Sequence, residues 1–492
     1  MKRILALVLA AALALPLVAC GGGGSLVQDE TETETLIRTT APVTAETAGV
    51  HDATGFCAGF GREDITPQDP VPLAGYGNTS HRISTNALDE LYVTCFLLQD
   101  ENGERLAILQ YDMIAIWSGL QETMRKQVAK AAGVAEDHVL LNATHTHSGH
   151  DGNNTADEAI NRWQTLLFKA TADAARKAAA DLDRCTVFVG TTETDRLNFV
   201  RRYYLENGFV CDNAEYGDGA IVGHETEVDQ EMRIVKFDRV NQPDLIIANW
   251  QCHPHRTGGS SKTDISSDII GVMRRRTEEN LDAKLLYLQG GGGNINPTSR
   301  ISSEVRWGGY KEIGQALYEH LAEGLNDLTE TKTGSIRAQY GELEGVVNHE
   351  KDAIAGDCQT ITQLVSSGKM SDAAALIAKH NLSSKFEASA IVSRSKLGET
   401  YTIPIYCYAF GDVGIAAAPF EMFCQTEKQL REDSPFSFTL TCGYSNGAQG
   451  YMPAAECFPN KGYEVDTCRY VQGTAERINE VQLGMLSELK AK

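Results

Sequence analysis

The chain is predicted to be an α/β protein, with layered, mixed β-sheets flanked by helices in one large domain. From residue 56 onward, short apolar runs typical of strands alternate with stretches of helical spacing. We find no internal repeat in the 492 residues, so a repeat architecture is not indicated. Strands and helices mixed along the whole length indicate one layered α/β unit.

In the first half of this domain, the predicted strands are short runs of apolar and β-branched residues bounded by turn residues. They are residues 56–62, 91–98, 106–114, 139–143 and 186–190. Two segments carry apolar residues at intervals of three and four, which is typical of amphipathic helices. These predicted helices are residues 121–132 and 156–181.

The same two patterns continue in the second half. Further strands are predicted at residues 234–237, 245–250, 284–289 and 401–418. Residues 261–281 are expected to form a loop and then a helix, and helices are also predicted at 310–326 and 476–490. Residues 359–380 are rich in Ala and Leu, which predicts a helical insertion within about 348–400.

The N-terminus has the pattern of a targeting segment. Lys2 and Arg3 precede an apolar run at residues 4–16, which is too short to span a bilayer and indicates a signal peptide. The letters LVAC that follow resemble a bacterial lipobox, which implies that Cys20 is lipidated. Residues 1–20 are therefore predicted to be a lipoprotein signal peptide, and the mature chain to be lipid-anchored and extracytoplasmic in a bacterial cell envelope.

Residues 21–54 are predicted to be a flexible acidic tether. They contain a Gly/Ser run, an acidic Thr/Glu run and a Thr/Ala/Pro stretch without apolar periodicity. Such a composition buries too little apolar surface to offset the entropy lost on ordering. The folded catalytic domain is thus expected at residues 55–492.

Charge and cysteine usage exclude some classes of function. The formal net charge is −22 and no basic stripe occurs, so nucleic acid is not expected as a partner. Apart from Cys20, eleven of the twelve cysteines remain, and no CxxC pair is present. This excludes a zinc knuckle and a small disulfide scaffold. Cys457 and Cys468 flank a short loop and are able to pair, whereas Cys95 and Cys407 are expected to be buried thiols.

A histidine cluster directly follows the predicted strand 139–143, within the letters NATHTHSGHD of residues 142–151. In an extended segment, residues two apart point to the same side, so His145 and His147 are expected to face one pocket. Imidazole is a common metal ligand and carries protons near neutral pH. The alternative is a pair of hydrogen-bonded loop histidines.

Two further polar segments also follow predicted strands. The letters QCHPHR at 251–256 place His253 and His255 two apart, and strand ends in α/β proteins are common ligand sites. The two histidine clusters together predict a metal site. In the letters LQGGGGNINP at 288–297, four glycines allow close approach of the backbone, with N–H groups able to bind an oxyanion. The alternative is a flexible turn, and the absence of a following Gly-Lys-Ser/Thr disfavours a nucleotide loop.

The order of these segments resembles the neutral/alkaline non-lysosomal ceramidase family. The resemblance runs from about residue 56 to residue 469 and rests on short motifs in the family's order. They are GFGREDITP (59–67), PLAGYG (72–77), ATHTHSG (143–149), NW to HP (249–254), SSD (266–268) and GNINP (293–297). Residues 348–400 do not resemble the family.

The resemblance implies one zinc ion and a set of site residues. Its ligands would be His145, His253, Glu421 and Tyr451. Without the resemblance, two of these residues have other interpretations. Glu421 would be a carboxylate at a helix N-terminus, and Tyr451 would be a half-buried aromatic residue in a loop. A water or a substrate carbonyl would complete such a set.

The resemblance also implies residues that act beside the metal. His147 and Tyr463 would be catalytic, through proton transfer or stabilisation of an oxyanion. Arg201, or its neighbour Arg202, would line the substrate pocket. The family's loop presents a serine where this chain has Asn296, and an amide cannot act as a nucleophile. Asn296 is instead expected to position the carbonyl, together with N–H groups of the loop around Gly293.

The function implied is a zinc-dependent amidohydrolase that cleaves N-acylsphingosine or a related N-acyl lipid with a metal-activated water. One alternative keeps the fold and the zinc but changes the substrate to a different N-acyl compound or an ester. A third interpretation is a non-catalytic ligand-binding lipoprotein. The expected partners are a small amide or N-acyl lipid substrate and, through the anchor, a membrane.

Overall fold

The computed structural model describes residues 55–76, 82–150, 152, 157–208, 210–212, 221–259, 261–304 and 308–492. The predicted signal peptide with Cys20, the predicted tether at 21–54 and Asp151 lie outside these residues. In the described part of the chain, no helix has both the length and the apolar character needed to cross a membrane.

The main sheet contains nine strands of the described chain. They are β1 (Cys57–Asp64), β3 (Tyr92–Gln99), β4 (Arg105–Tyr111), β5 (Val139–Ala143), β6 (Asp183–Glu193), β11 (Glu231–Arg239), β12 (Asp244–Trp250), β14 (Ala283–Gln289) and β16 (Thr329–Glu330). The order is β14-β12-β11-β6-β1-β3-β4-β5, with β16 beside β6. The β4–β5 and β12–β14 pairs are parallel and the pairs between them are antiparallel.

A second mixed sheet packs on one face of the main sheet. Its order is β17 (Ile336–Val346), β18 (Thr400–Phe410), β19 (Val413–Ala417) and β21 (Phe438–Cys442). An apolar core lies between the two sheets and includes Phe237 of β11 and Phe410 of β18, whose ring centroids are 6.0 Å apart. Removing this apolar surface from water is the main force that holds the sheets together.

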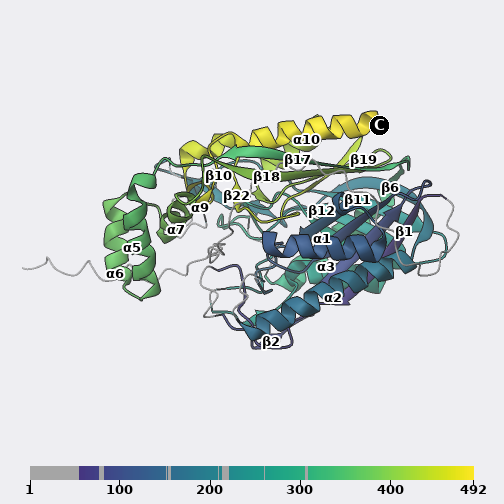
Figure 1. Cartoon of the computed structure of the whole chain (residues 1–492), viewed down its shortest axis with the longest axis horizontal. Helices are drawn as coiled ribbons and strands as arrows, with labels where there is room; N and C mark the ends of the chain where they lie inside the picture. Colours follow the sequence, from purple (N-terminus) through teal and green to yellow (C-terminus); the bar gives the residue numbers. More distant parts are fainter. Residues whose placement is uncertain are drawn as a thin grey trace, which may run out of the picture.

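Helices cover the outer face of each sheet. On the main sheet lie α1 (Ser118–Ala132), α2 (Glu158–Ala180), α3 (Asp268–Asn280) and α4 (Tyr310–Gly324). On the second sheet lie α8 (Cys424–Asp433) and α10 (Thr474–Ala491). Figure 1 shows the resulting four layers, with α10 at the top and α1 to α3 at the bottom. The predicted fold class, α/β with mixed sheets flanked by helices, is confirmed.

Short elements connect these layers near the strand ends. They are β2 (Asn86–Ala87), β7 (Phe199–Val200), β8 (Arg202–Leu205), β9 (Val210–Asp212), β10 (Ile221–His224), β13 (Asp264–Ile265), β15 (Ile295–Asn296), β20 (Glu421–Met422), β22 (Tyr451–Met452) and α9 (Tyr463–Thr467). Strand β15 pairs with β7, and β20 pairs in parallel with β22. These pairs join segments that are distant in sequence.

Two segments differ from their predicted form. Residues 401–418, predicted as one strand, form a hairpin of β18 and β19 that turns at Gly411, whose φ is +55°. Residues 359–380, predicted as one helical stretch, contain parts of α5 (Ala355–Ser366) and α6 (Met370–Lys379), separated by a turn at Gly368. With α7 (Lys385–Arg394) they form a three-helix segment that has its own apolar cluster and lies at one end of the molecule (Figure 1).

Several cysteines of the described residues are free and buried, among them Cys95 and Cys407, as predicted. Cys457 and Cys468 are also free, so the pairing that their spacing allowed is not formed. Burial raises the pKa of Cys468 to about 11, which favours the protonated thiol.

Gly61 permits β1 to pack closely against α2. A Cβ at Gly61 would lie 1.9 Å from the carbonyl oxygen of Ala174, a backbone atom that cannot move independently of α2. We expect Gly61→Ala to destabilise the fold by about 1–3 kcal/mol, measured by urea unfolding. Gly484→Ala is the matched control, because a Cβ there meets nothing within 4 Å in the helix α10. The control should be neutral or slightly stabilising, and equal unfolding midpoints for the two variants would contradict this account.

Candidate metal centre

The site forms where the two ends of the main sheet meet. Strands β5 and β14 are the first and last in the strand order, yet their carboxyl ends touch. Asn142 of β5 donates from Nδ2 to the carbonyl oxygen of Gln289 of β14 (3.3 Å), and its Oδ1 accepts from the Gln289 amide (2.9 Å). The loops that follow β5, β12 and β14 therefore come together.

His145 is held in an unusual backbone conformation. Its φ is +67°, a left-handed value that is uncommon for residues other than glycine. Its amide donates to Met113 (2.9 Å), and its Nδ1 donates to the carbonyl oxygen of Ile114 (2.6 Å). That hydrogen bond fixes the tautomer in which Nε2 carries a lone pair. His145 and His147 were expected to face one pocket because both would lie in an extended segment. That reason is wrong, because the strand ends at Ala143 and the backbone at His145 is not extended.

His253 is oriented by the glycine-rich loop. Its Nδ1 lies 2.7 Å from the carbonyl oxygen of Gly292 and 3.0 Å from that of Ile295. As a donor to these carbonyls, Nδ1 carries the proton, and Nε2 is left with a lone pair. The loop passes so close that a Cβ at Gly293 would lie 2.4 Å from the carbonyl oxygen of Glu421.

Glu421 lies opposite both imidazoles. Its Oε2 is 3.3 Å from the Nε2 of His145 and 3.3 Å from the Nε2 of His253. This buried oxygen has no hydrogen-bond partner among the described residues. His147 completes the cluster, with its Nε2 3.2 Å from that of His145. Ligand atoms of the three histidines all lie within 4.8 Å of one another.

The donor set fits a metal ion. Two imidazole lone pairs and one carboxylate oxygen converge in a buried space, and burying such acceptors without a positive partner is costly. Burial also lowers the pKa of His253 and of His147 well below the usual range, which keeps the imidazoles in the neutral form that binds metal. A divalent cation would satisfy all of these atoms.

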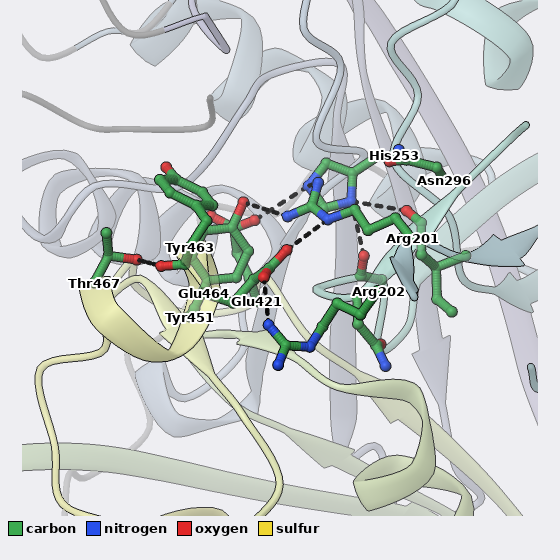
Figure 2. A network of polar contacts seen from close by, with 12 residues as sticks. Arg201, Arg202, His253, Asn296, Glu421, Tyr451, Tyr463, Glu464 and Thr467 are labelled. Atoms are coloured by element: carbon green, nitrogen blue, oxygen red, sulfur yellow. Dashed lines mark hydrogen bonds and ion pairs between the residues drawn. The ribbon is translucent and has the colours of Figure 1, made fainter. Parts of the chain in front are cut away.

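Figure 2 shows Tyr451 and Arg201 beside His253 and Glu421. Tyr451 pairs with Glu421 across β20 and β22, and its phenol oxygen accepts a hydrogen bond from Nη2 of Arg201 (3.1 Å). Nη1 of the same guanidinium lies 3.4 Å from the Nε2 of His253. The structure thus brings together all four residues predicted as metal ligands, with Arg201 beside them; the coordination itself stays a prediction.

Asn296 is tied to a histidine of the same cluster. Its Oδ1 is 3.0 Å from Nε2 of His255, whose ring centroid is 5.8 Å from that of His147. Tyr463 is packed edge-on against Tyr451, with centroids 5.4 Å apart. Both residues are therefore adjacent to the centre, as predicted from the resemblance, and their catalytic roles stay predictions.

Gly293 is placed differently from the role expected for it. Its N–H donates to the carbonyl oxygen of Met422 (2.8 Å), so this amide is already used in the fold. We correct the expectation that this N–H binds a substrate oxygen. The glycine instead provides the close approach between the loop and the Glu421 backbone.

Three contacts of the site were not predicted from the sequence. The ring of Tyr444 packs against His145, with centroids 4.3 Å apart. Arg82 is buried and donates to the carbonyl oxygen of His147 (3.0 Å). Glu464 forms an ion pair with Arg201 (2.7 Å). The only signal for Glu464 was its position next to Tyr463.

Known proteins resemble this chain in sequence and in fold. The family model described as neutral/alkaline non-lysosomal ceramidase, N-terminal, matches residues 56–292. This part of the chain is similar to the neutral/alkaline non-lysosomal ceramidase family. The matched part contains His145, His147, Arg201 and His253, whereas Glu421 and the two tyrosines lie beyond it. The family resemblance predicted from the sequence is confirmed.

Individual relatives agree with this assignment. Neutral ceramidase of Pseudomonas aeruginosa is 25% identical over 303 residues, which are 57% of this chain and 44% of that protein. The chain thus aligns with less than half the length of this relative. A solved structure titled "Ceramidase complexed with C2" has a TM-score of 0.67 at 16% identity, covering 89% of this chain and 76% of the other. The crystal structure of the Pseudomonas aeruginosa neutral ceramidase gives a TM-score of 0.65 at 16% identity, with 89% and 75% covered.

Metal binding should be visible as stabilisation. Adding Zn²⁺ to chelator-treated protein should raise the unfolding temperature, because a ligand at about 1,000 times its Kd stabilises the folded state by about 4 kcal/mol. Glu421→Gln and His253→Ala should lose most of this shift, since the first removes the negative charge of the carboxylate and the second removes a converging imidazole. His320→Ala in the outer helix α4 is the control and should keep it. A full shift in both site variants would show that the ion binds elsewhere.

Proposed function

We propose that the chain is a zinc-dependent amidohydrolase that cleaves the amide bond of N-acylsphingosine or a related N-acyl lipid with water. The observation that carries this proposal is the convergence of His145 and His253 on the Glu421 carboxylate. Two imidazoles, a carboxylate and a nearby phenol form a set typical of catalytic zinc. The family of residues 56–292 supports the reaction class.

His145, His253, Glu421 and Tyr451 would hold the ion. A bound zinc supplies Lewis acidity and promotes the ionisation of water near neutral pH. The chain's own contribution is to fix the tautomers of both imidazoles, through the carbonyl groups that accept from each Nδ1.

Two side chains are placed to assist the reacting carbonyl. The Arg201 guanidinium, which contacts Tyr451 and His253, provides positive charge where negative charge develops on the carbonyl oxygen. His147 is buried beside His145, with the two Nε2 atoms 3.2 Å apart, and would pass a proton to the departing amine. Tyr463 adds a phenol on the Tyr451 side of the centre.

Asn296 makes a direct water attack the consistent route. Its amide is not a nucleophile, so no acyl-enzyme forms at this position. Held by His255, the amide is suited to orient the substrate carbonyl. Hydrolysis then takes place in one addition and elimination at the scissile amide.

A different N-acyl compound or an ester is the second candidate substrate. It is favoured by Asn296 in the loop and by the three-helix segment, which lies in the stretch that does not resemble the family. The proposed lipid anchor at Cys20 would hold the enzyme on a bacterial membrane, where N-acyl lipids are found. Chromatographic assay of N-acylsphingosine against simple N-acyl amines and esters, with and without a chelator, separates the two candidates. Turnover that is unaffected by metal removal would reject zinc dependence for either.

His145→Ala should abolish both bound zinc and hydrolysis, because it removes a ligand whose orientation the fold fixes. Asn296→Ala should retain zinc and lose activity, since it removes only the group that orients the carbonyl. Elemental analysis of the purified variants, together with the amide assay, measures both effects. Full zinc content in His145→Ala would contradict the ligand assignment, and zinc loss in Asn296→Ala would contradict the separate role of the amide.

A further inference from the structure

Arg201 belongs to a buried ionic network that extends away from the metal centre (Figure 2). Glu464 accepts from Nε of Arg201 (2.7 Å) with one oxygen and from Nη1 of Arg202 (3.0 Å) with the other. On its far side, Arg202 donates from Nη2 to Glu225 (3.0 Å). The side chains of all four residues are at most 3% exposed.

The geometry of a guanidinium makes Glu464 decisive for where Arg201 points. The group is planar, so fixing its Nε edge also fixes the directions of Nη1 and Nη2. Glu464 holds Nε, and the other two nitrogens, Nη1 and Nη2, face His253 and Tyr451. Rotation of the guanidinium would break both of these contacts at once.

Charge balance gives the same carboxylate a second effect. Arg201 and Arg202 are neighbours in sequence, and two buried guanidiniums repel each other unless a negative group lies between them. Burial alone would raise the pKa of Glu464, but the two arginines outweigh burial and hold its pKa below the usual value. Glu464 therefore stays ionised and shared between them.

We propose that Glu464 is the positioning residue for Arg201, and that it holds the guanidinium against Tyr451 and His253 at the metal centre. This inference rests on the proposed function for its kinetic consequence, but its geometric consequence is independent of any substrate. Glu464 itself does not touch the metal ligands in the contacts described. It acts through Arg201.

The test compares Glu464→Gln with Glu225→Gln in the full chain. Both replace a carboxylate of the same buried network by an isosteric amide; Glu464 accepts from Arg201, whereas Glu225 accepts from Arg202. Glu464→Gln should keep its zinc and lower kcat about 10- to 100-fold with little change in KM. Glu225→Gln should stay within about threefold of the parent in both constants. Equal losses in the two variants would indicate a merely structural network and overturn the proposal.

A double-variant comparison isolates the route through Arg201. In the Arg201→Ala background, Glu464→Gln should change kcat by less than about twofold, because residues that act through one another are not additive. Multiplying effects would show that Glu464 acts by another route. If Glu464→Gln does not fold, Glu464→Asp keeps the charge but withdraws it by one methylene, and it should lower kcat in the same non-additive way.

The visible spectrum of the Co²⁺-loaded protein gives a readout that needs no turnover. Displacement of Arg201 should alter the Co²⁺ absorption bands in Glu464→Gln, while Glu225→Gln should leave them unchanged. If the parent protein hydrolyses no acyl substrate, the proposed function fails, and the Co²⁺ spectra still decide the positioning role. Unchanged bands in Glu464→Gln would then overturn it.

Discussion

The hydrogen-bonded contact between Asn142 and Gln289 is the interaction on which the site depends. It joins β5 to β14, which the strand order places at opposite ends of the main sheet. Asn142 also donates to the carbonyl oxygen of Gly443, in the loop after β21 of the second sheet. One buried amide thus links the loops after β5, β14 and β21, which carry His145, the glycine-rich segment that orients His253, and the ring of Tyr444. Without that closure the two histidine clusters would lie at separate ends of the sheet.

The centre gathers polar groups that a folded interior ordinarily avoids. His145 has a left-handed backbone, and the Glu421 oxygen that faces the imidazoles has no hydrogen-bond partner among the described residues. Such features cost stability and persist only where the surrounding structure determines them. Carbonyl acceptors on each Nδ1 and the ionic network behind Arg201 provide that surrounding structure. A cation bound where the acceptors converge would offset this loss of stability.

The sequence predicted the elements whose burial leaves a local pattern. Strands β5, β12 and β14 are almost fully buried and consist mostly of apolar residues, and their predicted bounds agree with the structure to within about one residue. Strand β17 was not predicted because it has no continuous apolar run: exposed polar residues such as Glu342 and Glu344 alternate with buried ones. The hairpin of β18 and β19 was read as one strand because its turn at Gly411 lies between two apolar runs.

The site was predictable only in part, for a related reason. His145 and His253 stood out because they cluster with other histidines at strand ends, whereas Glu421 and Tyr451 needed a family resemblance. The contacts of Glu464 and Tyr444 depend on packing between segments more than 250 residues apart, as between Arg201 and Glu464, and no local pattern reports that. His145 and His147 do lie side by side, as expected, but the expectation assumed an extended strand, which the chain does not form beyond Ala143.

The short helix α9 connects the candidate metal centre to the three-helix segment of α5, α6 and α7. It contains Tyr463 and Glu464, which contact Tyr451 and Arg201 on one side. On the other side, Phe386 of α7 packs edge-on against Tyr463, with centroids 5.7 Å apart. Changes in the three-helix segment can therefore reach the aromatic edge of the site without altering any of the four predicted metal ligands. The three-helix segment contacts the site through Tyr463 and not through the four predicted ligands. The ligand set therefore does not by itself determine which substrate the site accepts.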